Sequence, residues 1–285
     1  MRTILLLIAC LAFLPLQGQN RSFFNLDNPI TIDGKVSNYQ PRENNRFITL
    51  RTYDVLGNSH DTAIAIKPDG SFFMRFIVPY PSEFDIMYSG TFIPLLPAIG
   101  ERYTIEIDDK AWSTNENKAS AISMSGEMGR ISNTIIDFSY NYSKHNFKTE
   151  VNWSDKSKSD EEAVNLRIKR LKEELQFLED YIRERNAGNA VFQSWAKNHI
   201  VYEAGNEILF VLFTSSRHKS YTHDQLLRLL KEFPIDNSPA VMNSRYFAFL
   251  KGITSDLVIM FNINPAYANL RKQYGNNPFP FVSEK

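Results

Sequence analysis

From about residue 30 to residue 125, hydrophobic residues gather in short stretches, and polar residues lie between them. These stretches are rich in β-branched and aromatic residues and lie at 30–36, 46–54, 62–67, 71–78, 83–88, 92–96 and 103–107. Turn sequences such as Leu56-Gly57-Asn58 and Pro68-Asp69-Gly70 separate them and supply residues that tolerate positive φ. Strands at this spacing, with such turns, predict an antiparallel β-sandwich, which we place at residues 26–125.

The hydrophobic period changes at Ser125-Gly126. Apolar residues then recur at steps of three and four, which predicts a helix to about Tyr142 with one apolar face: Met128, Ile131, Ile135, Phe138 and Tyr142. Residues 146–158 are polar, with Trp153 as a large apolar anchor, and are expected to form a loop.

The strongest helix prediction begins at Ser159, which forms a capping box with Glu162, and ends at Gly188. Its expected seam is Val164, Ile168, Leu171, Leu175, Leu178 and Ile182. Because this seam is shorter than three heptads, we expect an intramolecular hairpin rather than a dimer zipper. The partner helix is predicted at 190–213, antiparallel to the first, with this face: Phe192, Trp195, Ala196, His199, Tyr202, Leu209 and Phe213.

A short helix and a further helix are expected next. Thr222 and Gln225 cap one that Pro234 ends, and Ser238-Pro239 opens another that carries Met242, Tyr246, Phe249 and Leu250. Asn, Gly and Pro dominate after residue 260, which predicts an irregular tail. The expected fold class is therefore α+β in segregated halves: an N-terminal antiparallel β-sandwich (26–125), an α-helical hairpin or bundle (126–260), and a tail (261–285).

The first residues have the pattern of a secretory signal. Arg2 precedes an apolar run from Ile4 to Leu16, and we expect a signal peptide at 1–18, cleaved after Gly18. A competing interpretation makes Cys10 the lipidated residue of a lipoprotein, although the apolar run continues beyond it. No later stretch reaches the roughly 20 apolar residues of a membrane helix. An exported protein of the periplasm or outer envelope is expected, without a transmembrane helix in its mature part.

Charge and cysteine content exclude several functions. The 32 basic and 32 acidic residues cancel and are scattered, so no nucleic-acid surface is expected. Cys10 is the single cysteine, and it leaves with the signal if cleavage follows Gly18. The mature chain would then lack thiol-disulfide chemistry and thiolate metal ligands. We expect no cofactor.

Candidate metal ligands lie at four-residue steps on one helix. His199, Glu203 and Glu207 share a face, but this helix carries no second histidine, and His218 and His223 lie in or beside the next loop. A structural histidine beside solvated glutamates is the preferred interpretation, so we predict no metal. Because no pair of acids or nucleophile stands out either, we expect a protein that is not an enzyme.

Several short motifs resemble secreted proteins of Bacteroidetes-type bacteria. In these TlpA-like thiol-disulfide oxidoreductases, a β-sandwich domain of unknown function and a helical segment precede a thioredoxin-like domain. The resemblance covers residues 30–250 and depends on Ile32-Asp33-Gly34-Lys35-Val36, Pro68-Asp69-Gly70-Ser71-Phe72, Pro97 with Gly100-Glu101, Ser125-Gly126, and the stretches 192–212 and 237–250. The sequence contains no counterpart of the thioredoxin-like domain or its paired cysteines, so no catalytic residue is carried over.

Three hypotheses of function remain open. The first is a non-catalytic envelope module that binds or positions a partner. The second is an accessory or truncated half of a thioredoxin-like thiol-disulfide oxidoreductase system, whose partner would be a thioredoxin-like envelope protein. The third is a glycan-binding module, which would need exposed aromatic residues on the sandwich surface. The sequence determines neither the ligand nor the oligomeric state.

Overall fold

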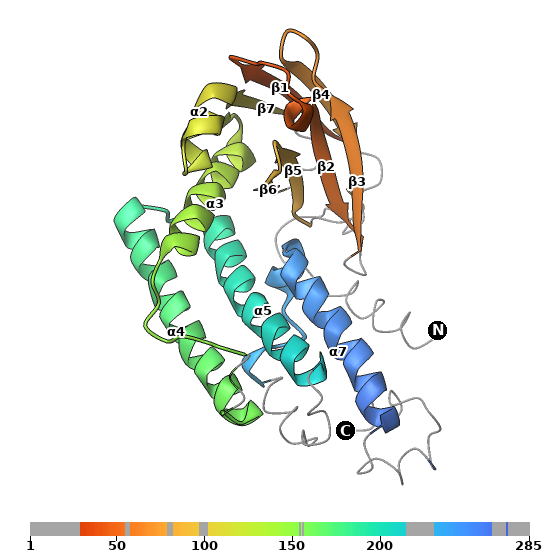
Figure 1. Cartoon of the computed structure of the whole chain (residues 1–285), viewed down its shortest axis with the longest axis vertical. Helices are drawn as coiled ribbons and strands as arrows, with labels where there is room; N and C mark the ends of the chain where they lie inside the picture. Colours follow the sequence, from red (N-terminus) through yellow and green to blue (C-terminus); the bar gives the residue numbers. More distant parts are fainter. Residues whose placement is uncertain are drawn as a thin grey trace.

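The computed structural model describes residues 29–54, 58–78, 82–96, 102–153, 155, 157–214, 231–263 and 272. The predicted signal, Cys10, His218 and His223 lie outside these residues. Strands occupy the first part of the described chain and long helices follow, as the sequence predicts (Figure 1).

The strands form two four-stranded sheets. Their bounds are β1 Ile30–Ser37, β2 Phe47–Tyr53, β3 Ser59–Ala65, β4 Ser71–Phe76, β5 Phe84–Tyr88, β6 Thr91–Leu95, β7 Arg102–Asp108 and β8 Ile122–Met124. Sheet A has the order β4-β1-β7-β8 and sheet B the order β3-β2-β5-β6. Sheet B is antiparallel throughout, but β1 and β7 pair in parallel. The prediction of a wholly antiparallel fold is therefore wrong for β1 and β7. All four strands of sheet B lie between these two strands in the sequence.

Buried residues of both sheets belong to one hydrophobic cluster. Alternation along the strands produces this burial: Ile48 and Leu50 in β2 are 0% and 5% exposed. Gly34 in β1 pairs with Phe72 in β4, and a Cβ atom on Gly34 would lie 1.8 Å from the Phe72 ring. A glycine is required there because the aromatic ring occupies the space of a side chain.

The helices are α2 Asp109–Thr114, α3 Glu127–Lys144, α4 Asp160–Arg185, α5 Ala190–Thr214 and α7 Ser244–Ile263, with 3-10 turns η1 Glu43–Asn45, η2 Lys118–Ala121 and η3 Ser238–Met242. The capping box of Ser159 and Glu162 is confirmed. Helix α4 ends earlier than predicted, because Asn186 adopts the left-handed conformation (φ 51°) two residues before Gly188. The predicted short helix after Thr222 lies outside the described residues up to Lys231.

Four elements were not predicted: η1, α2, η2 and β8. Asp108 caps α2 by accepting from the backbone N–H groups of Lys110 and Ala111, directly at the end of β7. This N-cap is the signal that could have revealed α2. Strand β8 is only three residues long, too short for a period to be recognised.

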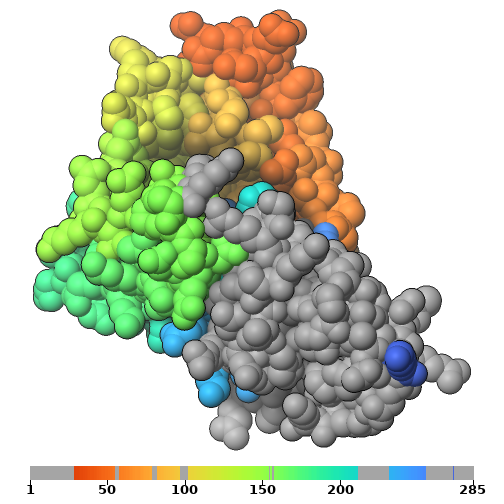
Figure 2. Space-filling model, turned by 60° about the horizontal axis from the view of Figure 1, so that its bottom comes forward, coloured from red at the N-terminus to blue at the C-terminus, as the bar shows by residue number. Residues whose placement is uncertain are grey.

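Helix α5 lies between α4 and α7, and α3 reaches the sheets through contacts with β6 and β8 (Figure 1). In the described part of the chain, the strand half and the helical half are stacked end to end (Figure 2). Helices α5 and α7 approach closely at Gly205, where a Cβ atom would lie 2.8 Å from the Phe249 ring. Helix α5 is buried on several sides.

The buried stripe of α4 differs from the predicted seam by a rotation. Val164, Leu171 and Leu178 are buried as expected, but the alternate buried positions are Arg167, Glu174 and Tyr181. The predicted residues Ile168, Leu175 and Ile182 are one position further along and are partly buried. Helix α4 therefore turns two charged side chains inward.

Candidate functional site

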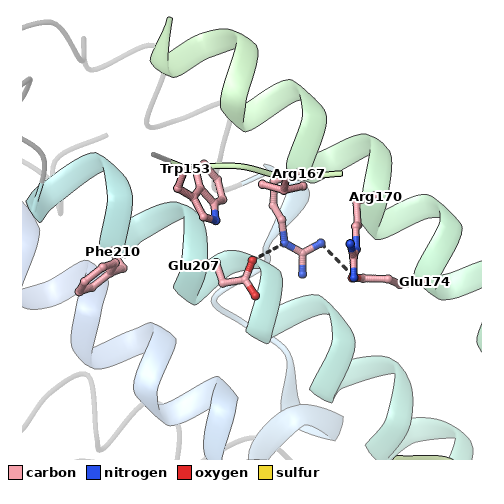
Figure 3. A pocket seen from close by; sticks show the side chains of 7 residues that line it. Trp153, Arg167, Arg170, Glu174, Glu207 and Phe210 are labelled. Carbon is pink, nitrogen blue, oxygen red and sulfur yellow. Dashed lines mark hydrogen bonds and ion pairs between the residues drawn. The ribbon is translucent and has the colours of Figure 1, made fainter. Parts of the chain in front are cut away.

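A cavity of about 410 Å³ opens beside the inward-turned charges of α4. Its lining comes from the loop before α4, from α4 and from α5: Val151, Trp153, Arg167, Arg170, Glu174, Glu207 and Phe210 (Figure 3). This volume lies within the roughly 300–1,000 Å³ typical of small-molecule sites.

A chain of ion pairs forms one side of the cavity. Arg167 Nε donates to Glu207 Oε2 at 2.7 Å, and Arg167 Nη1 donates to Glu174 Oε2 at 2.9 Å. Arg170 Nε donates to the other oxygen of Glu174 at 3.0 Å. The side chains of Arg167 and Glu174 are each 3% exposed, whereas that of Glu207 is 42% exposed. The pairing of early α4 with late α5 also confirms that the two helices are antiparallel.

Aromatic residues surround this network. Trp153 is partly buried and packs against the helical core, whereas Phe210 is 68% exposed. The Arg170 guanidinium lies 4.5 Å from the ring centre of Phe147. Burial, with the nearby Glu174 carboxylate, raises the pKa of Tyr142 well above its usual range. The cavity thus combines donors, acceptors and aromatic surface.

A second polar centre joins the two halves of the molecule. Glu83, directly before β5, is 4% exposed and accepts hydrogen bonds from the indole of Trp195 in α5 and from the backbone N–H of Ser244 at 2.9 Å. Its own N–H donates to Met242 O at 2.8 Å. Burial raises the pKa of Glu83, and the hydrogen bonds from Ser244 and Trp195 oppose this shift.

The candidate metal ligands do not converge. His199 stacks on Trp195 with ring centres 4.8 Å apart, and burial lowers its pKa to about 3. Glu203 pairs with Arg245 of α7 at 2.9 Å, and Glu207 pairs with Arg167 of α4. Each carboxylate therefore has a cation from a different helix. Among the described residues, no group of three or more potential ligands could hold a metal ion.

Sheet B has an outward face with exposed apolar residues. Thr49 pairs with Met87, which pairs with Phe92, so these residues share a face with Phe47. Phe47 and Phe92 are 50% and 43% exposed, and the Arg51 guanidinium lies 4.4 Å from the ring centre of Phe92. On sheet A, Phe72 is buried but Phe73 is 52% exposed.

Several residues of these sites were not found from sequence. Glu83 gave no signal, because its partners are more than a hundred positions away. Arg167 and Glu174 could have been recognised as opposite charges two turns apart on the predicted helix, in line with the apolar seam. Trp153 was identified only as the large apolar residue of its loop.

Comparisons with family models, with curated proteins and with solved structures give no match for this chain. Within the described residues, no helix combines the length and hydrophobicity needed to span a membrane.

Proposed function

We propose that this chain is a non-catalytic, exported module of the cell envelope that binds and positions a protein partner. The observation that carries the proposal is the outward face of sheet B, where Phe47 and Phe92 are exposed beside the partly buried Met87 and the Arg51–Asp61 ion pair. Export is supported by the signal-like residues 1–18, and a thioredoxin-like partner is supported by the resemblance of residues 30–250.

The two sheets differ in what they present outward. Along β1 of sheet A the outward positions are Thr31, Asp33 and Lys35, which are polar or charged. On sheet A, Phe73 of β4 is exposed among these polar residues. On sheet B, Phe47 and Phe92 are both exposed on a face that they share with the partly buried Met87 and with Ala63 and Ala65 of β3. Aromatic residues and methionine are enriched at protein interfaces. Sheet B is therefore the face that we assign to the partner.

We further propose that sheets A and B face each other as a sandwich. The support is that their inward residues belong to one hydrophobic cluster. Glu83 then ties the sandwich to α5 and α7, so a protein bound to sheet B would be held in a fixed position relative to the helices.

The test is crosslinking of the protein in the envelope of its host, followed by mass spectrometry. We expect recovery of a thioredoxin-like protein, and loss of this recovery when Phe47 and Phe92 are both replaced by serine. Phe73→Ser is the matched control, because Phe73 is equally exposed but lies on sheet A. Equal recovery by all three proteins, or no protein partner for folded wild-type protein, would overturn the proposal.

The alternative, a truncated half of a thioredoxin-like oxidoreductase, depends on the same resemblance. The mass of the natural gene product distinguishes this alternative from the first proposal. A product extended by a thioredoxin-like domain with paired cysteines would favour this alternative.

A further inference from the structure

We propose that the cavity between α4 and α5 binds a neutral saccharide, which stacks on Trp153 and forms hydrogen bonds with Arg167 and Glu207. This site lies in the helical half and is independent of the protein-binding face of sheet B. The chemistry of the lining, the balance of its charges and the rigidity of its polar groups lead to this ligand class.

Sugars present two kinds of surface, and the cavity matches both. Their hydroxyl groups donate and accept hydrogen bonds, and their C–H faces pack on aromatic rings. Arg167 and Arg170 offer donors, Glu207 offers an acceptor, and Trp153 and Phe210 offer rings on one rim of the same cavity (Figure 3).

The charges of the lining favour an uncharged ligand. Arg167 and Arg170 balance Glu174 and Glu207, and all four are joined by ion pairs. An anionic ligand would meet the 42% exposed side chain of Glu207, and a cationic ligand would meet that of Arg170, which is 31% exposed. Neither an anionic nor a cationic ligand gains a net electrostatic attraction there.

The polar groups are positioned before any ligand arrives. Arg167 is fixed by two carboxylates, and Figure 3 shows hydrogen bonds from two of its three guanidinium nitrogens. Within the described residues, Arg167 Nη2, Glu207 Oε1 and Trp153 Nε1 have no hydrogen-bond partner. These groups keep capacity for ligand hydroxyls, and fixing their side chains in advance lowers the entropic cost of binding.

The first experiment is a glycan array probed with the purified wild-type protein, followed by calorimetry with the neutral oligosaccharides that bind. Trp153→Ala removes the stacking ring, and we expect at least a tenfold rise in Kd. Glu207→Gln keeps an oxygen that can accept a hydrogen bond from Arg167 but replaces the other carboxylate oxygen by an amide donor. We expect a similar loss of affinity. Phe92→Ala on sheet B is the matched control and should leave Kd unchanged.

Folding of each variant is checked by near-ultraviolet circular dichroism. If Trp153→Ala does not fold, the test is decided by Glu207→Gln and by Phe210→Ala, which changes a 68% exposed side chain. The proposal is overturned if folded wild-type protein binds no neutral glycan, if it prefers anionic glycans, or if the folded cavity variants bind as tightly as wild type. If folded wild-type protein binds a neutral glycan but recovers no protein partner, only the proposed function is contradicted.

Discussion

Arg167 and Glu174 lie two turns apart on α4 and form an ion pair at 2.9 Å, with both side chains 3% exposed. Their burial decides which side of α4 faces α5. The apolar residues Ile168 and Leu175 follow them by one position and are only partly buried. Charged residues can take such positions because each has a partner that compensates for lost hydration.

Replacement of Arg167 by alanine should destabilise the protein strongly. It leaves the buried Glu174 with Arg170 alone and removes the partner of Glu207, and breaking a buried pair costs about 3–5 kcal/mol. The free energy of unfolding from urea denaturation measures this. Arg183→Ala removes an exposed ion pair on the same helix and should change the free energy of unfolding by less than about 1 kcal/mol. Equal effects of the two variants would show that the buried pair does not stabilise the fold.

Glu83→Ala should weaken the connection between the strand and helical halves. The change leaves the Trp195 indole and the Ser244 N–H without their acceptor, and each buried unsatisfied donor costs about 1–3 kcal/mol. We expect a loss of about 3 kcal/mol, measured by chemical denaturation. Glu106→Ala, on the outward face of sheet A, should cost no more than about 0.5 kcal/mol. A loss for Glu83→Ala as small as that of the control would contradict the assigned role of Glu83.

His199 should make stability depend on pH. Its pKa is about 3 in the folded protein, because burial and the nearby Arg245 disfavour the charged form. In the unfolded chain its pKa is about 6.5, so the unfolded state binds more protons between these values. The contribution of His199 is therefore complete above pH 6.5 and is lost as the pH falls, by up to about 1.4 kcal/mol per pH unit.

The variant His199→Phe keeps a ring against Trp195 but cannot titrate. The pKa values of Glu83, Asp85 and Glu203 are raised by burial, and these groups favour the folded state at low pH in both proteins. The difference between the two proteins therefore isolates the histidine. We expect the free energy of unfolding of wild type, relative to the variant, to fall between pH 7 and pH 4. Parallel pH profiles would mean that His199 is not buried in its neutral form.

Gly205→Ala should destabilise the protein although alanine favours helices. The new Cβ atom would lie 2.8 Å from the Phe249 ring and 3.2 Å from the Phe233 ring, so α5 and α7 would have to separate. Overpacking of this kind costs about 1–3 kcal/mol. Gly188→Ala is the control, because no atom lies within 4 Å of its added Cβ. Thermal unfolding should show a lower Tm for Gly205→Ala alone, and an unchanged Tm would show that α7 adjusts freely.

Local sequence patterns specify most of the secondary-structure elements of this protein. Short stretches of β-branched and aromatic residues between turns identified the strands from β1 to β7. A period of three to four residues identified α3, α4 and α5, and Ser159 with Glu162 marked the start of α4. These features depend on residues that are close together in the chain. Local backbone preference and alternation of burial are enough to define them.

Tertiary structure decided the rest. The parallel pairing of β1 with β7, the ion pair of Arg167 with Glu207, and the burial of Glu83 depend on partners tens to more than a hundred residues away. A local sequence pattern predicts that a charged side chain lies at the surface, because its burial is unfavourable until a distant partner is present. The polar centres of this protein arise where the folded chain brings such partners together.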